Sequence, residues 1–267
     1  MTALLLRSLM RARFVLIGGG LLICALQIVI IGHAAEVQRT NAFASVANLM
    51  PAFLQRGLGN KAMLLATFKG TVAFGYFHPV VCLLITAMAM FITTEVAHEV
   101  ESGLVDLELA RTVPRRRLLS RSLVLSLSAV LAVLMVMALG TLVGIRIFDA
   151  GAMDLPSPRM RMELLVNLFA LATCFSALGL LVASASRRWA TAFTAVALTS
   201  VVSYIIDFLA LGWTPAKTIA WLSPFHYYPA LSILAGDADT ARNLSILLVV
   251  SAAMIAAAYW QFQRRDL

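Results

Sequence analysis

The charged side chains that could take part in chemistry gather in one polar segment. Residues 95–121 carry five of the thirteen acidic residues and five of the twenty-one basic residues, with the acids before the arginines. The segment opens with EVAHE, in which His98 lies between Glu95 and Glu99. A histidine among carboxylates raises metal ligation, but this order differs from the H-E-x-x-H pattern of zinc proteases. We therefore predict that these residues belong to a polar loop and do not form a metal site.

Motifs for other reactions are missing from the sequence. It contains neither the G-x-x-x-x-G-K-[ST] phosphate loop nor the G-x-S-x-G turn of hydrolases. The four histidines are scattered singly, and the three cysteines lie in apolar runs, where a thiol behaves as a small hydrophobe. We predict that the chain is not an enzyme, has no catalytic residue and binds no cofactor itself.

The composition is that of a membrane protein. Of the 267 residues, 61% are hydrophobic and only 13% are charged, against about 25% charged residues in an ordinary soluble domain. The net charge of +8 fits loops that face anionic lipid headgroups, so we predict contact with membrane lipid and no nucleic-acid partner.

Six apolar runs have no lysine or arginine at their centres, and they lie at about 14–33, 72–94, 122–145, 164–186, 190–211 and 243–262. Their lengths approach the twenty or so residues that a bilayer-spanning helix needs. Backbone groups in lipid must hydrogen-bond within their own segment, so we predict six transmembrane helices. The fold class is all-α, and residues 1–267 form a single membrane domain.

The distribution of basic residues predicts the orientation. With the N-terminus in the cytoplasm, twelve of the 21 lysines and arginines lie inside in short segments, and nine lie outside in longer loops. The positive-inside rule therefore favours two cytoplasmic termini and a cytoplasmic 95–121 loop.

Two further segments suggest close packing. Gly140 and Gly144 form a G-x-x-x-G pair, which lets helices approach each other; we favour packing within one subunit, and a dimer contact stays open. Segment 221–236 mixes aromatic residues with prolines and is predicted to re-enter the membrane from outside, packed against protein. The core of this re-entrant segment is Pro224, Phe225, His226, Tyr227 and Tyr228.

The first half of the polar segment carries more than topology requires. Leucines alternate with Asp106 and Glu108 between Gly103 and Pro114. We predict one or two helical turns on the cytoplasmic surface, which present apolar side chains and carboxylates to a soluble partner.

The same stretch resembles a known family. E-x-E-S-G-L-V-D-L-E-L-A-R followed by R-R-R-L-L is similar to the segment after the second span of type-2 ABC exporter permeases, although Pro114 falls two places late. The L-S-P-F-H-Y-Y stretch at 222–228 and F-Q-R-R-D-L at 262–267 also resemble this family. The matching residues of the polar segment are Glu99, Glu101, Ser102, Gly103, Leu104, Asp106, Leu107, Leu109 and Arg111.

The resemblance implies the membrane subunit of an ATP-driven exporter in a bacterial cytoplasmic (inner) membrane. Two permease copies, identical or different, would form the pathway, and separate cytoplasmic ABC ATPase subunits would bind ATP and Mg. These ATPases would dock on the matching residues and the neighbouring Glu108, while residues 4–13 would run along the membrane surface.

Other functions stay open on the sequence alone. A non-transporting membrane anchor or assembly factor could recruit a cytoplasmic protein through the same loop. A membrane enzyme or an ion-coupled carrier is a further alternative. Carriers hold ionisable residues inside the helix bundle, whereas Asp207 is the one carboxylate well inside a predicted span and lies near its outer end.

Overall fold

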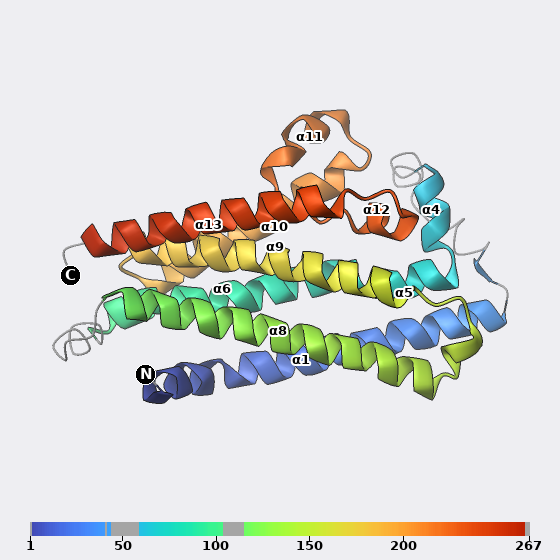
Figure 1. The fold of residues 1–267 in the computed structure, drawn as a ribbon, viewed down its shortest axis with the longest axis horizontal. Coiled ribbons are helices and arrows are strands. Elements are labelled where there is room, and N and C mark those ends of the chain that lie inside the picture. Colours follow the sequence, from blue (N-terminus) through green and yellow to red (C-terminus); the bar gives the residue numbers. More distant parts are fainter. Residues whose placement is uncertain (1, 41, 44–58, 104–114, 265–267) are drawn as a thin grey trace.

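The computed structural model describes residues 2–40, 42–43, 59–103 and 115–264, so most of the predicted docking stretch lies outside the described residues. The described residues form helices and turns, with no strand among them, which confirms the all-α prediction. Six long helices run along one common direction (Figure 1). They are α1 (Thr2–Arg39), α6 (Pro79–Glu101), α8 (Arg115–Ile147), α9 (Pro158–Ala185), α10 (Trp189–Ala210) and α13 (Thr240–Arg264).

Shorter elements complete the described fold: α4 (Asn60–Leu65), α5 (Phe68–Phe77), η1 (Ala150–Ala152), α11 (Thr214–Ile219), η2 (Ala220–Leu222), η3 (Pro224–Tyr227) and α12 (Ala230–Ala235). Both chain ends lie at one end of the bundle, together with the end of α6 and the start of α8 (Figure 1). We call this the terminal end. The opposite end, which we call the far end, carries α4, α5 and α12.

Six segments of the described chain are long and apolar enough to cross a membrane, as the sequence predicts. The second of them, Phe68–Glu101, is two helices rather than one. Pro79 disfavours helical backbone at the preceding residue, and His78 is accordingly extended at φ −54° and ψ 135°. His78 then caps the new helix, because its Nδ1 accepts the N–H of Val80 at 3.2 Å.

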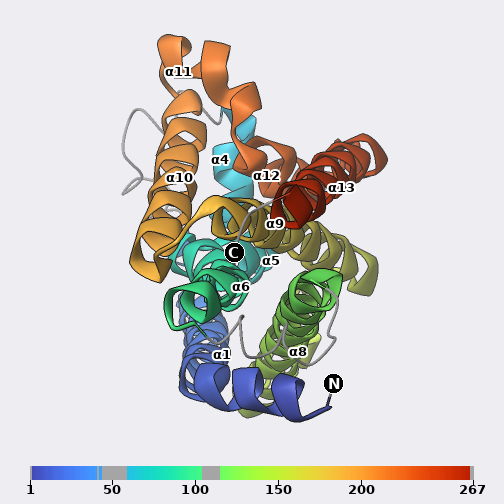
Figure 2. The same ribbon diagram turned by 90° about the vertical axis from the view of Figure 1, so that its left-hand side faces the viewer.

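Helix α6 lies at the centre of the bundle, where it contacts α1, α8, α9 and α10 (Figure 2). Its side chains Ile85, Met88 and Met90 are buried in the main apolar core. In the same core lie Met137 of α8 and Phe175 of α9. A helix that is apolar all round is suited to this central position.

Hydroxyl groups connect these helices inside the bundle. Thr86 of α6 bonds Ser200 of α10 at 3.1 Å, and Ser126 of α8 bonds Ser176 of α9 at 2.9 Å. Apolar contact alone gives little drive for helices to associate in lipid, so each such bond contributes on the order of 0.6–2 kcal/mol.

Gly140 and Gly144 face α1. A Cβ atom at Gly140 would lie 3.0 Å from the carbonyl oxygen of Cys24, and one at Gly144 would lie 2.9 Å from Cδ1 of Ile31. The absence of a side chain at both glycines therefore lets α8 approach α1 closely. In this structure the G-x-x-x-G pair packs within one subunit.

The terminal end differs in shape from the far end. The first turns of α1 run across it (Figure 2). Helix α11 projects sideways from the bundle beyond α10 (Figures 1 and 2). Many large apolar side chains of α1, α10 and α13 are exposed, among them Phe14, Leu198 and Val249, as expected of surfaces that meet lipid.

The α1–α8 contact can be tested by filling it. Gly140→Leu places a branched side chain against the backbone of Cys24, so we expect a loss of about 1–3 kcal/mol in unfolding free energy. Denaturant unfolding of the purified protein in detergent measures the change. Gly18→Leu is the control, because no atom lies within 4 Å of its added Cβ. Equal effects of the two substitutions would contradict close packing at Gly140.

Candidate coupling site at the end of helix α6

The last turns of α6 carry three glutamates that bind three different helices. Glu95 Oε1 lies 3.2 Å from Nη1 of Arg11 in α1. Glu99 forms an ion pair with Arg121 of α8. Glu101 Oε2 accepts the backbone N–H of Trp189, the first residue of α10, at 2.9 Å. These three contacts, which we call the α6 hub, join the end of the central helix to three of its neighbours.

Helix α6 ends at the hub for a local reason. The Ser102 hydroxyl donates to the carbonyl of His98 at 2.8 Å, and the Gly103 N–H donates to that of Val100 at 3.2 Å. Gly103 has a φ of +68°, a left-handed conformation that glycine adopts without a steric cost. The added Cβ would meet no atom within 4 Å, so the glycine is needed for the turn of the chain and not for space.

The Glu99–Arg121 pair is the buried contact of the hub. Glu99 is 6% exposed and Arg121 is 3% exposed, whereas the Arg11 side chain of the Glu95 contact is 36% exposed. Apolar residues pack around the terminal end of α6 and α8, including Val96, Leu118 and Leu119. Removing charges from water is costly, so the loss of either partner would leave the other as an uncompensated charge in apolar surroundings.

The pair also brackets the predicted docking stretch. Glu99 precedes residues 104–114 in the sequence and Arg121 follows them, and the pair joins the end of α6 to the first turns of α8. Of the predicted coupling residues, the structure brings Glu99, Glu101, Ser102 and Gly103 together. The others lie outside the described residues: Leu104, Asp106, Leu107, Glu108, Leu109 and Arg111.

The sequence analysis missed the partners of the acids. Arg121 is buried against α6 and is the partner of Glu99. The sequence analysis took the acids as groups for an external partner, whereas three of the five have partners within the chain. The one available signal was that basic residues flank the acids on both sides, at Arg11 and from Arg115 onward, and such a pattern does not specify pairs.

Comparison with known families identifies the chain. Residues 5–263 match the family described as Multidrug efflux system permease Rv1217c, C-terminal domain. The chain belongs to this permease family. The resemblance to an exporter permease is thereby confirmed, and the protein is a multi-pass membrane permease of a transport system. No curated protein and no solved structure matched the permease.

The predicted re-entrant segment of the permease packs against the bundle. The Ser223 hydroxyl donates to the carbonyl of Ser203 in α10 at 2.9 Å. The centroid of the Phe225 ring lies 5.3 Å from the ring centroids of Phe175 and Tyr204. The Tyr228 hydroxyl donates to the carbonyl of Tyr76 in α5 at 3.1 Å. Burial raises the pKa of Tyr228, so this phenol stays protonated as a donor.

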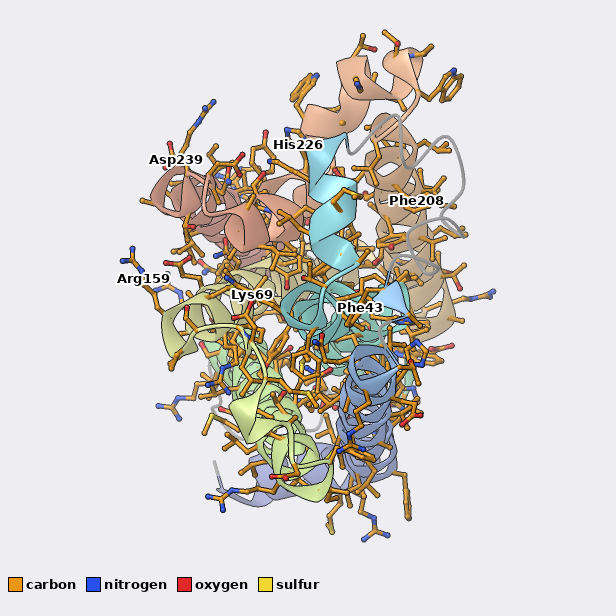
Figure 3. All side chains as sticks on the ribbon, turned by 90° about the vertical axis from the view of Figure 1, so that its right-hand side faces the viewer. Phe43, Lys69, Arg159, Phe208, His226 and Asp239 are labelled. Carbon is orange, nitrogen blue, oxygen red and sulfur yellow. The ribbon has the colours of Figure 1, made fainter. Side chains whose placement is uncertain are left out.

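His226 lies on the exposed side of the same segment. Its Nδ1 is 3.7 Å from the carboxylate of Asp207 in α10, which raises the pKa of His226 against the opposing effect of partial burial. Tyr227 donates its hydroxyl to the carbonyl of Trp221 at 3.0 Å. Figure 3, a view onto the far end, shows His226 between Asp239 on one side and Phe208 of α10 on the other. Among the described residues no three His, Cys, Asp or Glu side chains come together as a metal site.

The buried pair of the hub makes a stability prediction. Glu99→Ala removes the carboxylate partner of a buried guanidinium, so we expect a loss of about 3–5 kcal/mol in unfolding free energy. Replacing both Glu99 and Arg121 by Leu removes both charges and should recover most of that loss. Denaturant unfolding of the purified permease measures each variant. Glu163→Ala is the control, because its partner Arg159 is exposed and we expect about 0–1 kcal/mol there. A double variant that is as unstable as Glu99→Ala, or less stable, would contradict the pair.

The His226–Asp207 contact predicts a pH dependence. A raised pKa in the folded state means that the contact stabilises fully below the unfolded value of about 6.5 and is lost as pH rises through the raised value. Asp207→Asn should therefore lower the melting temperature at pH 5.5 and leave it nearly unchanged at pH 8.5. Asp237→Asn is the control, because the partner of Asp237 is Lys61, which stays charged over this range. A loss of the same size at both pH values would exclude His226 as the cause.

Proposed function

We propose that this permease is the membrane-spanning subunit of an ATP-driven ABC exporter. Separate ATPase subunits bind ATP and Mg, and they dock on the cytoplasmic segment 95–121, which begins in the last turns of α6 and ends in the first turns of α8. Two permease copies, identical or different, enclose the pathway in a bacterial cytoplasmic membrane. The observation that carries the proposal is the α6 hub, since it joins the start of the docking stretch to α1, α8 and α10.

The orientation of the proposal rests on charge. The terminal end carries Arg11 and Arg13 of α1, Arg116 and Arg117 of α8, and Arg188 before α10. The positive-inside rule assigns such an end to the cytoplasm. This assignment puts the docking stretch on the side where ATP is available.

The hub gives a mechanical route from the ATPases to the spans. ATP binding draws the two ATPases together and displaces the docked stretch, and α6 is the first helix to receive the force. The buried Glu99–Arg121 pair makes α6 and α8 move as one body, since separating it would leave charges in an apolar surrounding. The more exposed Arg11–Glu95 contact is worth about 0–1 kcal/mol, so it adds little to the packing that holds α1 on α6 and α8.

Transport is the function that the family membership favours over a membrane anchor, because the family is described as an efflux permease. An anchor needs one contact with its partner. It has no need for that contact to be tied to three spanning helices.

The proposal predicts that the acids of the docking stretch hold the ATPase. Replacing Asp106 and Glu108 together by Ala should weaken ATPase binding about tenfold or more, which corresponds to about 1.4 kcal/mol. Copurification of the ATPase encoded nearest in the genome, together with cargo-stimulated ATP hydrolysis in liposomes, measures the effect. The melting temperature of the permease alone should not change.

Glu163→Ala serves as the matched control for this experiment, because it removes one acid at the far end of the bundle. If no ATPase copurifies with the unmodified permease, or if binding and hydrolysis survive the Asp106 and Glu108 changes, the proposal fails.

A further inference from the structure

A cavity of about 210 Å³ lies beside the α6 hub, between α1, α6 and α10 at the terminal end. Arg11, Phe91, Glu95, His98 and Trp189 line it. Its residues come from the three helices that the hub joins, but ATPase coupling requires no cavity there. The combination of two aromatic rings with one carboxylate is therefore unexplained by the proposed function.

The aromatic wall of the cavity is rigid. The Trp189 ring stacks on Phe193 at 5.4 Å with an interplanar angle of 15°, and Phe91 meets both rings edge-on at 6.0 and 6.2 Å. Glu101 holds the backbone N–H of Trp189 at 2.9 Å, so the first turn of α10 is fixed to the end of α6. Aromatic rings placed in advance attract a cation through the negative charge of their faces.

The charged side of the cavity has an exchangeable partner. The Glu95 side chain is 13% exposed, and its partner Arg11 is 36% exposed and meets it through one contact at 3.2 Å. Such a partly exposed ion pair is weak, so another cation can replace Arg11 at the carboxylate. His98 completes the lining on the α6 side.

We propose that this cavity binds the quaternary ammonium head of an amphipathic organic cation. Phe91 and Trp189 contact the alkylated nitrogen, Glu95 neutralises its charge, and Arg11 moves aside. The volume of the cavity is below the 300–1,000 Å³ of pockets that enclose a whole drug-sized ligand, so the apolar tail stays in the surrounding lipid. The same chemistry is present in a free cargo molecule and in the choline headgroup of a lipid.

The proposal names a class of cargo for the exporter, and this role as cargo rests on the proposed function. Binding itself requires no ATPase. We therefore test it on the full-length permease alone, in nanodiscs, so that a failure here leaves ATPase docking untouched and a failure of docking leaves binding measurable.

The test measures saturable binding of radiolabelled dodecyltrimethylammonium to nanodiscs made of a neutral sugar lipid. We expect Trp189→Ala and Glu95→Gln each to weaken binding by roughly threefold to thirtyfold. Trp189→Phe retains a ring, so it should weaken binding less than Trp189→Ala does, which separates loss of the aromatic contact from loss of folding. Trp260→Ala is the matched control, because Trp260 is an exposed tryptophan of α13 outside the cavity lining.

Arg11→Gln gives the result of opposite sign. It removes the competing cation, so binding should strengthen by roughly twofold to fivefold. Weaker binding in Arg11→Gln would show that Arg11 supports the bound probe and does not compete with it, which would overturn the proposal. Absence of saturable binding, or equal binding in Trp189→Ala and Trp260→Ala, would also overturn it.

A second set of nanodiscs distinguishes the two sources of the cation. If phosphatidylcholine nanodiscs weaken the binding of the probe relative to the sugar lipid, the choline headgroup occupies the cavity. Equal binding in both lipids assigns the cavity to a free amphipathic cation. Either result supports recognition of a quaternary ammonium group.

Discussion

A carboxylate and a guanidinium that have both left water must stay together, and this constraint organises the terminal end of the permease. Glu99 and Arg121 bring the end of α6 to the beginning of α8. Glu101 then fixes the start of α10, and the stacked rings of Trp189 and Phe193 follow from that position. The weaker Arg11–Glu95 contact adds α1.

Elsewhere the bundle is held by contacts that suit a lipid solvent. Apolar side chains gain little by leaving lipid for a protein core, so shape and hydrogen bonds decide which helices pair. Gly140 and Gly144 set the approach of α8 to α1, and hydroxyl pairs such as Ser126–Ser176 connect α8 to α9. The ion pair at the terminal end differs from these contacts because both of its partners are charged, but it likewise fixes the positions of two helices.

Hydropathy and charge were sufficient to predict six spanning helices, because lipid imposes length and internal hydrogen bonding on every span. The break in the second span could have been anticipated from Pro79, but an apolar run of this length conceals it. The site was only partly predictable. Gly103 and Ser102 are recognisable from their own chemistry at a helix end, whereas the pairing of Glu99 with Arg121 depends on how α6 and α8 pack. Spacing in the sequence contains no information on that packing.

The break at His78 and Pro79 limits what the second span can transmit. An unbroken helix transmits a translation or a rotation along its whole length. Two helices joined at an extended residue, here His78, can instead change the angle between them. On the terminal side, α6 is held by its own glutamates. On the far side, α5 is held separately: the Tyr76 hydroxyl bonds Thr141 of α8, and the Tyr228 hydroxyl donates to the backbone carbonyl of Tyr76. Helix α6, with 23 residues, is long enough to cross a bilayer by itself. A displacement applied at the terminal end therefore reaches the far end along α6, and only α5, which packs on α1 and α9, lies beyond the joint.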